Sequence, residues 1–348
     1  MIFLESMTSF EKNIMKAIIL LITVSLGLGN LSFADEPAAT RYTFATTKQS
    51  RDILTADDNY MNRMSVAEIA IRTSSVTADK TAEDLKALYA ANILEWTEAE
   101  KAQITELVAA NKARLATIQH LLPAEITFIK VNNKVEGGLP HTRGHGIILP
   151  ISAEGPSGST LSEELFYHEL FHILSRMQKN THHELYGLIG FKPCHYSGND
   201  DVNTNIRSNI RALTNPDVPA ESYYLPVSLE GVPSAIMPFL HTTRSAFDPT
   251  IQGGFRGHFR FGLLKVTVTD GQCIVDRDSE DNIEILDPPH VKDFFTAIGK
   301  NTAYIIHPEE ILAENFVFIM TGKTDLPNPE IPYRLKTWLT KNKKEKSF

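Results

Sequence analysis

The chain has 348 residues, of which 42% are hydrophobic and 22% are charged, and this composition is typical of a globular protein rather than a disordered one. The formal net charge of −8 disfavours nucleic acid as a partner, because nucleic-acid-binding surfaces are strongly basic. The length suits one enzyme domain with an additional subdomain.

The N-terminal segment has the parts of a secretory signal peptide. Lys16 precedes the apolar run Ala17–Leu28, and the small residues Ser32 and Ala34 follow it. The run is shorter than the roughly 20 apolar residues that a membrane-spanning helix needs. We therefore expect residues 1–34 to be a signal peptide. The mature protein is then exported, periplasmic or extracellular, with no stable membrane insertion.

The region 35–122 is expected to be helical. Thr81 with Asp84, and Thr97 with Glu100, have the spacing of capping boxes that begin helices, and apolar residues follow at helical spacing. This region is either part of the scaffold or a prosegment that covers the site until it is removed. The short linker between its strongest helix and the next predicted strand favours the scaffold.

An α+β fold is expected from the remaining elements. Residues 123–222 combine a small sheet with a motif helix, residues 223–290 form a β-rich insertion, and residues 291–348 form closing helices. A hairpin turn is predicted at Asp270 and Gly271. The predicted strands are Glu125–Val131, Gly146–Leu149, Leu225–Leu229, Ile236–Leu240, Phe259–Thr269 and Cys273–Val275. The predicted late helices are Val291–Ile298, Pro308–Met320 and Tyr333–Leu339.

Two cysteines, Cys194 and Cys273, are the only ones in the chain. In an oxidising compartment such a pair can form a disulfide bond, but sequence does not show whether the two Cα atoms lie within reach of each other. Neither cysteine is spaced like a zinc ligand or a catalytic thiol. A structural role is therefore expected for both.

The motif His168-Glu-Leu-Phe-His172 carries the chemistry. In a helix, residues four apart lie on the same face, so the two imidazoles can bind one tetrahedral zinc ion. Glu169 follows the first of them, where its carboxylate can accept a proton from the metal-bound water as that water attacks a carbonyl group. The pattern predicts His168 and His172 as metal ligands and Glu169 as the general base.

A catalytic zinc ion needs a third protein ligand and one open position. The candidates are Glu310, Glu309 and Glu184, and we favour Glu310. Glu310 and Glu314 are expected to lie one turn apart on the helix that Pro308 begins, so that Glu310 binds the metal while Glu314 accepts the N–H of a ligating imidazole.

The HELFH motif and the later Glu-x-x-Ala-Glu helix resemble the gluzincin branch of the zincin metallopeptidases. Gln178 stands where metzincins have a third histidine, so that subclass is excluded. The resemblance implies a zincin-like core, one Zn²⁺ ion bound by His168, His172 and Glu310, and hydrolysis of peptide bonds in a peptide or protein substrate. The segment Thr142–Pro150 is similar in placement to the zincin edge strand, which can pair with an extended substrate.

Other interpretations remain open. The chain is alternatively an exported binding or interaction protein that uses its β-rich region and holds a structural or vestigial metal. A third interpretation is a hydrolase that acts on a non-peptide amide. Tyr196, Tyr304 and His307 are candidate donors to the oxyanion of the transition state. The sequence does not indicate the oligomeric state.

Overall fold

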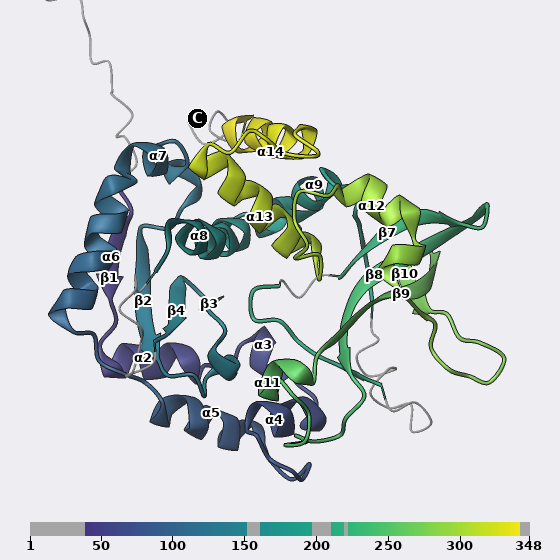
Figure 1. Cartoon of the computed structure of the whole chain (residues 1–348), viewed down its shortest axis with the longest axis horizontal. Coiled ribbons are helices and arrows are strands. Elements are labelled where there is room, and N and C mark those ends of the chain that lie inside the picture. The colour runs from purple at the N-terminus through teal and green to yellow at the C-terminus, as the bar shows by residue number, and fades with distance from the viewer. Residues whose placement is uncertain (1–38, 152–160, 197–209, 219–221, 342–348) are drawn as a thin grey trace, which may run out of the picture. The chain divides into compact units, whose positions relative to one another are not determined.

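The computed structural model describes four segments of the chain: residues 39–151, 161–196, 210–218 and 222–341. Helices and two separate sheets make this an α+β fold (Figure 1). The expected signal peptide, residues 1–34, lies outside these segments. Among the described residues, no helix has both the length and the hydropathy needed to cross a bilayer.

The N-terminal region contributes helices and one strand. Both predicted capping boxes are present. The Thr81 and Thr97 side chains accept the backbone N–H groups of Asp84 and Glu100, and the backbone N–H groups of Thr81 and Thr97 donate to the carboxylates of Asp84 and Glu100. Strand β1 was not predicted from sequence. The elements before residue 123 are β1 (Arg41–Phe44), α2 (Thr47–Leu54), α3 (Asn59–Asn62), α4 (Val66–Arg72), α5 (Ala82–Ala91), α6 (Glu98–Ala110) and α7 (Lys112–Ala116).

The first sheet has the strand order β1-β2-β4-β3 among the described residues. Strands β1, β2 (Glu125–Val131) and β4 (Gly146–Pro150) run parallel, whereas β3 (His141–Arg143) is antiparallel to β4. The expectation of an edge strand at 142–150 is therefore wrong for its second half. A tight turn at Gly144, where φ is +57°, folds β3 back along β4, so β4 is interior and β3 forms the edge.

The main hydrophobic core joins this sheet to a pair of helices, α8 (Glu163–Met177) and α13 (Pro308–Thr321). Phe128 of β2 faces Phe166 of α8 with ring centroids 6.4 Å apart, and Phe171 of α8 faces Phe316 of α13 at 5.5 Å. All four rings are fully buried. Burying each ring contributes roughly 2–3 kcal/mol. The core therefore fixes how α8 and α13 lie against each other.

The second sheet is antiparallel and contains all the strands predicted between residues 223 and 286. Its described strands follow the order β10-β9-β8-β7-β5, with β11 on β9 and β6 on β8. Asp270 and Gly271 form the predicted turn, both with positive φ. The strands are β5 (Lys192–Cys194), β6 (Arg211–Ala212), β7 (Ser222–Leu229), β8 (Val232–Thr242), β9 (Arg260–Thr269), β10 (Gln272–Val275) and β11 (Ile285–Leu286).

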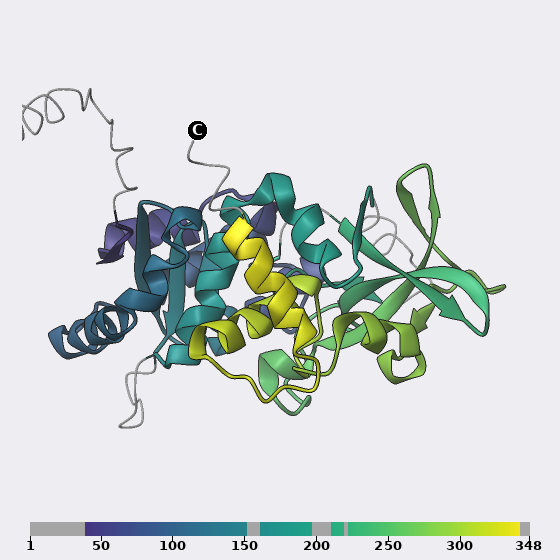
Figure 2. The same ribbon diagram turned by 90° about the horizontal axis from the view of Figure 1, so that it is seen from above.

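In Figures 1 and 2 the helix pair α8 and α13 lies between the two sheets. The predicted late helices are confirmed, with shifts of a few residues at their ends. The remaining helices are α9 (His182–Gly187), α11 (Gly254–Gly257), α12 (Lys292–Ile298) and α14 (Glu330–Lys341).

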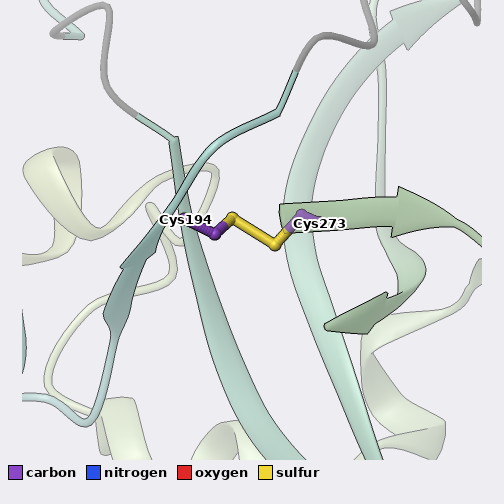
Figure 3. The surroundings of a disulfide bond; sticks show 2 residues. All are labelled: Cys194 and Cys273. Atoms are coloured by element: carbon purple, nitrogen blue, oxygen red, sulfur yellow. A yellow bond between two sulfur atoms is a disulfide. The ribbon is translucent and has the colours of Figure 1, made fainter. Parts of the chain in front are cut away.

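A disulfide bond joins Cys194 of β5 to Cys273 of β10, with the Cα atoms 5.9 Å apart (Figure 3). These strands stand at opposite ends of the sheet order. The His195 N–H donates to Gly271, and the Cys273 N–H donates to His195, each at 2.8 Å. The disulfide and these two hydrogen bonds therefore connect the two ends of the second sheet.

Replacing both cysteines by serine is expected to lower the free energy of unfolding by about 2–4 kcal/mol, because the bond closes a long loop in the unfolded chain. Urea denaturation of the oxidised protein and of the variant measures this difference. Metal affinity is expected to stay unchanged, since neither cysteine contacts the helix pair. Equal stabilities would contradict the structural role.

Candidate metal centre

Helix α8 presents both motif histidines on one face. Ser162 caps the helix by accepting the N–H of Leu165, at 3.1 Å. Leu170 is fully buried, as the apolar setting of the motif predicted. The rings of His168 and His172 follow each other along the helix with centroids 4.8 Å apart. Packing of the apolar face therefore fixes where the two imidazoles point.

Helix α13 brings three acidic residues to these rings. It begins after His307, whose Nδ1 accepts the N–H of Glu309, and Pro308 occupies its first turn as predicted. Glu309 and Glu310 are each 1% exposed. Glu314 lies one turn further along and is partly exposed. The first turns of α13 therefore place the carboxylates of Glu309, Glu310 and Glu314 next to α8.

Glu310 lies between the two imidazoles. Its Oε2 atom is 3.1 Å from Nε2 of His168 and 3.4 Å from Nε2 of His172. Ligand atoms that each lie about 2.0–2.1 Å from a tetrahedral zinc ion are about 3.3 Å apart. The second distance is too long for a good N–H···O hydrogen bond. His172 Nε2 is also buried without a hydrogen bond to the described residues. The three side chains therefore fit a divalent cation.

Carboxylates on the far side of each ring orient these Nε2 atoms. Nδ1 of His168 is 3.0 Å from Glu314, which is the predicted contact, and Nδ1 of His172 is 3.0 Å from Glu309. Glu309 also accepts the hydroxyl hydrogen bonds of Ser175 and Tyr186. Such partners fix the tautomer of a ligating histidine and raise its basicity.

The alternative third ligands occupy other positions. Glu309 faces Nδ1 of His172, so it lies on the side of the ring away from Glu310. Glu184 is exposed on α9 and does not belong to a cluster of metal-ligating groups among the described residues. The structure brings Glu310, and neither alternative, together with both Nε2 atoms.

Replacing Glu314 by alanine is expected to weaken zinc binding by about 10- to 100-fold, because His168 loses the partner that orients its ring. Competition with a chromophoric chelator measures the dissociation constant. Glu184→Ala is the matched control and is expected to bind zinc like the wild type. Equal affinities of the two variants would show that the Glu314 contact does not orient a ligand.

Glu169 is buried beside the two rings. It is 2% exposed, and its Oε2 atom has no hydrogen-bond partner among the described residues. Its carboxylate, an oxygen of Asp217 and a nitrogen of His172 all lie within 4.8 Å of one another. Burial, followed by the negative charge of Asp217, raises the pKa of Glu169 to about 8. A buried carboxylate with a free oxygen is suited to accept a proton.

The segment Thr214–Asp217 contacts the centre and was not predicted as part of it. Asn215 donates to Oε1 of Glu310 at 2.5 Å. Asp217 accepts the backbone N–H of Thr142 at 2.7 Å and its hydroxyl at 2.6 Å. No local pattern in the sequence indicates these contacts, because they join the segment to β3 and α13, which are far away along the chain.

The charges at the centre favour cations. Burial would lower the pKa of His168, but its contacts with Glu310 and Glu314 outweigh burial and raise that pKa to about 10. Burial would raise the pKa of Glu310, but the neighbouring His172 and His168 lower it. These carboxylates stabilise protons on the two rings, and they can stabilise a divalent cation that replaces those protons.

Of the three candidate oxyanion donors, Tyr304 lies at the centre. Its ring stacks on that of His168 at 5.9 Å. Burial and the charges of Glu310 and Asp217 raise the pKa of its hydroxyl, which stays protonated. His307 caps α13, and Tyr196 packs against the core of the second sheet.

In comparisons with protein-family models, curated proteins and solved structures, nothing matches the chain significantly. The functional assignment therefore depends on the side chains of α8, α13 and the segment Thr214–Asp217.

Proposed function

We propose that the chain is a zinc-dependent metallopeptidase of the gluzincin type. The observation that carries this proposal is the convergence of two Nε2 atoms on one oxygen of Glu310, at 3.1 and 3.4 Å. Beside them lies Oε2 of Glu169, which has no hydrogen-bond partner among the described residues. Two imidazoles and one carboxylate form a donor set that suits zinc. Zinc bound there would polarise a carbonyl group and lower the pKa of a water molecule.

The residues of the chain supply the remaining functions. Glu169 accepts a proton at Oε2 and later delivers it to the leaving amine. Tyr304 donates a hydrogen bond to the oxyanion from its place against His168.

Export fits this function. The apolar run Ala17–Leu28 and the small residues after it support a signal peptide and a periplasmic or extracellular location. A disulfide bond between Cys194 and Cys273 is compatible with an oxidising compartment. The substrate is then a peptide or protein outside the cytoplasm.

A structural zinc site is the second candidate, and one observation favours it. Asp217 lies within 4.8 Å of ligand atoms of Glu169 and His172, and Glu169, His172 and Glu310 are each at most 2% exposed. With Asp217 as a fourth ligand, the site would have no open position for water, as structural sites require. The protein would then be an exported binding protein.

Hydrolysis of a mixture of protein-derived peptides by the zinc-loaded protein distinguishes the two candidates. The peptidase is expected to cleave peptide bonds, to lose activity with a chelator and to regain it with zinc. Elemental analysis of the same samples reports zinc independently of activity. One bound zinc ion without any cleavage would favour the structural site.

A further inference from the structure

A cavity of about 400 Å³ adjoins the candidate metal centre. Its lining includes Asn215, which donates to Glu310, and Tyr304, which stacks on His168. A molecule that is bound at the centre would therefore extend into this cavity. The volume lies within the range of about 300–1,000 Å³ that is usual for ligand sites.

Part of the cavity lining is apolar and comes from the β-rich region and the loop before α13. It is formed by Leu240, Phe255, Phe259, Phe261 and Ile306. The rings of Phe255 and Phe259 contact each other edge to face, with centroids 4.7 Å apart. Such a wall favours a large apolar side chain, because the side chain leaves water when it binds.

Two exposed arginines, Arg256 and Arg260, belong to the same lining. Neither forms an ion pair within the described part of the chain, and Arg260 donates only to the carbonyl groups of Gly257 and Phe259. The acid in this lining that lies away from the centre, Glu136, is already paired with Arg72. The arginines are thus free to bind a carboxylate.

The edge strand of the first sheet runs along this cavity. Pro140 and His141 line it, and the N–H of the next residue, Thr142, points away from β4 to Asp217. An extended peptide that pairs with β3 would place a carbonyl oxygen where the Asp217 oxygen lies. The cavity would then receive one of its side chains.

We propose that this cavity selects the substrate, an inference that rests on the proposed peptidase function. The preferred peptide has a large apolar residue beside the scissile bond and a carboxylate beyond it. The apolar wall takes the side chain, and Arg256 and Arg260 bind the carboxylate. An acidic side chain and a chain terminus both provide this group.

Peptide binding tests the subsite without turnover. The zinc-loaded Glu169→Gln variant is titrated with fluorescein-labelled hexapeptides that carry Phe, Leu or Ala at one position and Glu or Gln at the next. Each peptide has a free or an amidated C-terminus. Replacing Phe by Ala is expected to weaken binding by about 10- to 100-fold. Removing the carboxylate is expected to weaken it by about 2- to 5-fold. The peptides with an amidated C-terminus show whether the Glu side chain or the C-terminal carboxylate is recognised.

The same titrations are repeated after the further substitutions Arg256→Ala and Arg260→Ala, with Arg51→Ala on α2 as the control. When Arg256 and Arg260 are replaced, the preference for a carboxylate is expected to disappear while the preference for Phe remains. The Arg51→Ala control is expected to keep both preferences. Equal binding of Phe and Ala peptides, or a carboxylate preference that survives without both arginines, would overturn the inference. Peptides that bind but are not cleaved by wild-type protein would contradict the peptidase and still support the subsite.

Discussion

Replacing Glu169 by glutamine is expected to slow peptide hydrolysis by about 10²- to 10⁴-fold while one zinc ion stays bound. Glutamine keeps the shape of the side chain but cannot accept a proton. The carboxylate of Glu169 is 2% exposed and has an oxygen without a hydrogen-bond partner among the described residues, so the substitution breaks no hydrogen bond of that oxygen. The turnover number and the zinc content of the same sample measure both parts of the prediction.

The matched control for this substitution is Glu164→Gln. Glu164 is exposed in the first turn of the same helix, one turn before His168, and it forms none of the hydrogen bonds of the centre. Its replacement is expected to leave rate and zinc content unchanged. If Glu169→Gln hydrolyses peptides at the wild-type rate, Glu169 is not the general base. If the variant loses its zinc, the position has a structural role.

Replacing Arg72 by methionine is expected to lower the free energy of unfolding by about 3–5 kcal/mol, because two buried carboxylates lose their counter-charge. The Arg72 side chain is 2% exposed and pairs with Glu68 at 2.7 Å and with Glu136. Burial raises the pKa of Glu68, whereas Arg72 and its neighbours outweigh burial at Glu136 and lower that pKa. Urea denaturation at pH 7 measures the change in stability.

The same cluster supports the metal centre. Arg72 donates to the carbonyl oxygen of Thr214 at 2.8 Å, and Glu68 accepts the Thr214 N–H at 2.7 Å. The next residue is Asn215, which contacts Glu310. Arg72→Met is therefore expected to weaken zinc binding as well.

The exposed Arg51 of α2 provides the control for Arg72. Arg51→Met is expected to change the free energy of unfolding by less than about 0.5 kcal/mol. Equal effects of Arg51→Met and Arg72→Met would mean that the buried cluster does not stabilise the fold. A fully stable Arg72→Met variant with weak zinc binding would separate the two roles of the cluster.

The same contacts indicate whether the region 35–122 is part of the scaffold or a removable prosegment. Strand β1 pairs with β2 in the first sheet, and Glu68 and Arg72 hold the segment that contacts Glu310. A removable prosegment would have to leave both the sheet and this buried cluster. The contacts therefore favour a scaffold role.

Local signals were enough to predict the two helices of the centre. The motif from His168 to His172 lies on a helix with apolar flanks, and Pro308 begins the helix that carries Glu310 and Glu314. Capping residues and residue spacing act within a few positions of the chain, so they can be recognised without knowing the tertiary structure.

The remaining features depend on tertiary contacts. Nothing in the sequence around Glu309 distinguishes its role from that of Glu310, because the difference arises from how α13 crosses α8. Asn215 and Asp217 were not predicted as site residues, because their partners are far away in the sequence. Strand β1 is short and was recognisable only through its pairing with β2.

Zinc titration of the wild type and of the single variants His168→Ala, His172→Ala and Glu310→Ala, followed by elemental analysis after dialysis, tests the ligand set most directly. The wild type is expected to retain one zinc ion per chain, and each variant is expected to lose stoichiometric binding. A wild type that retains no zinc, or a Glu310→Ala variant that retains it fully, would contradict the metal centre described here.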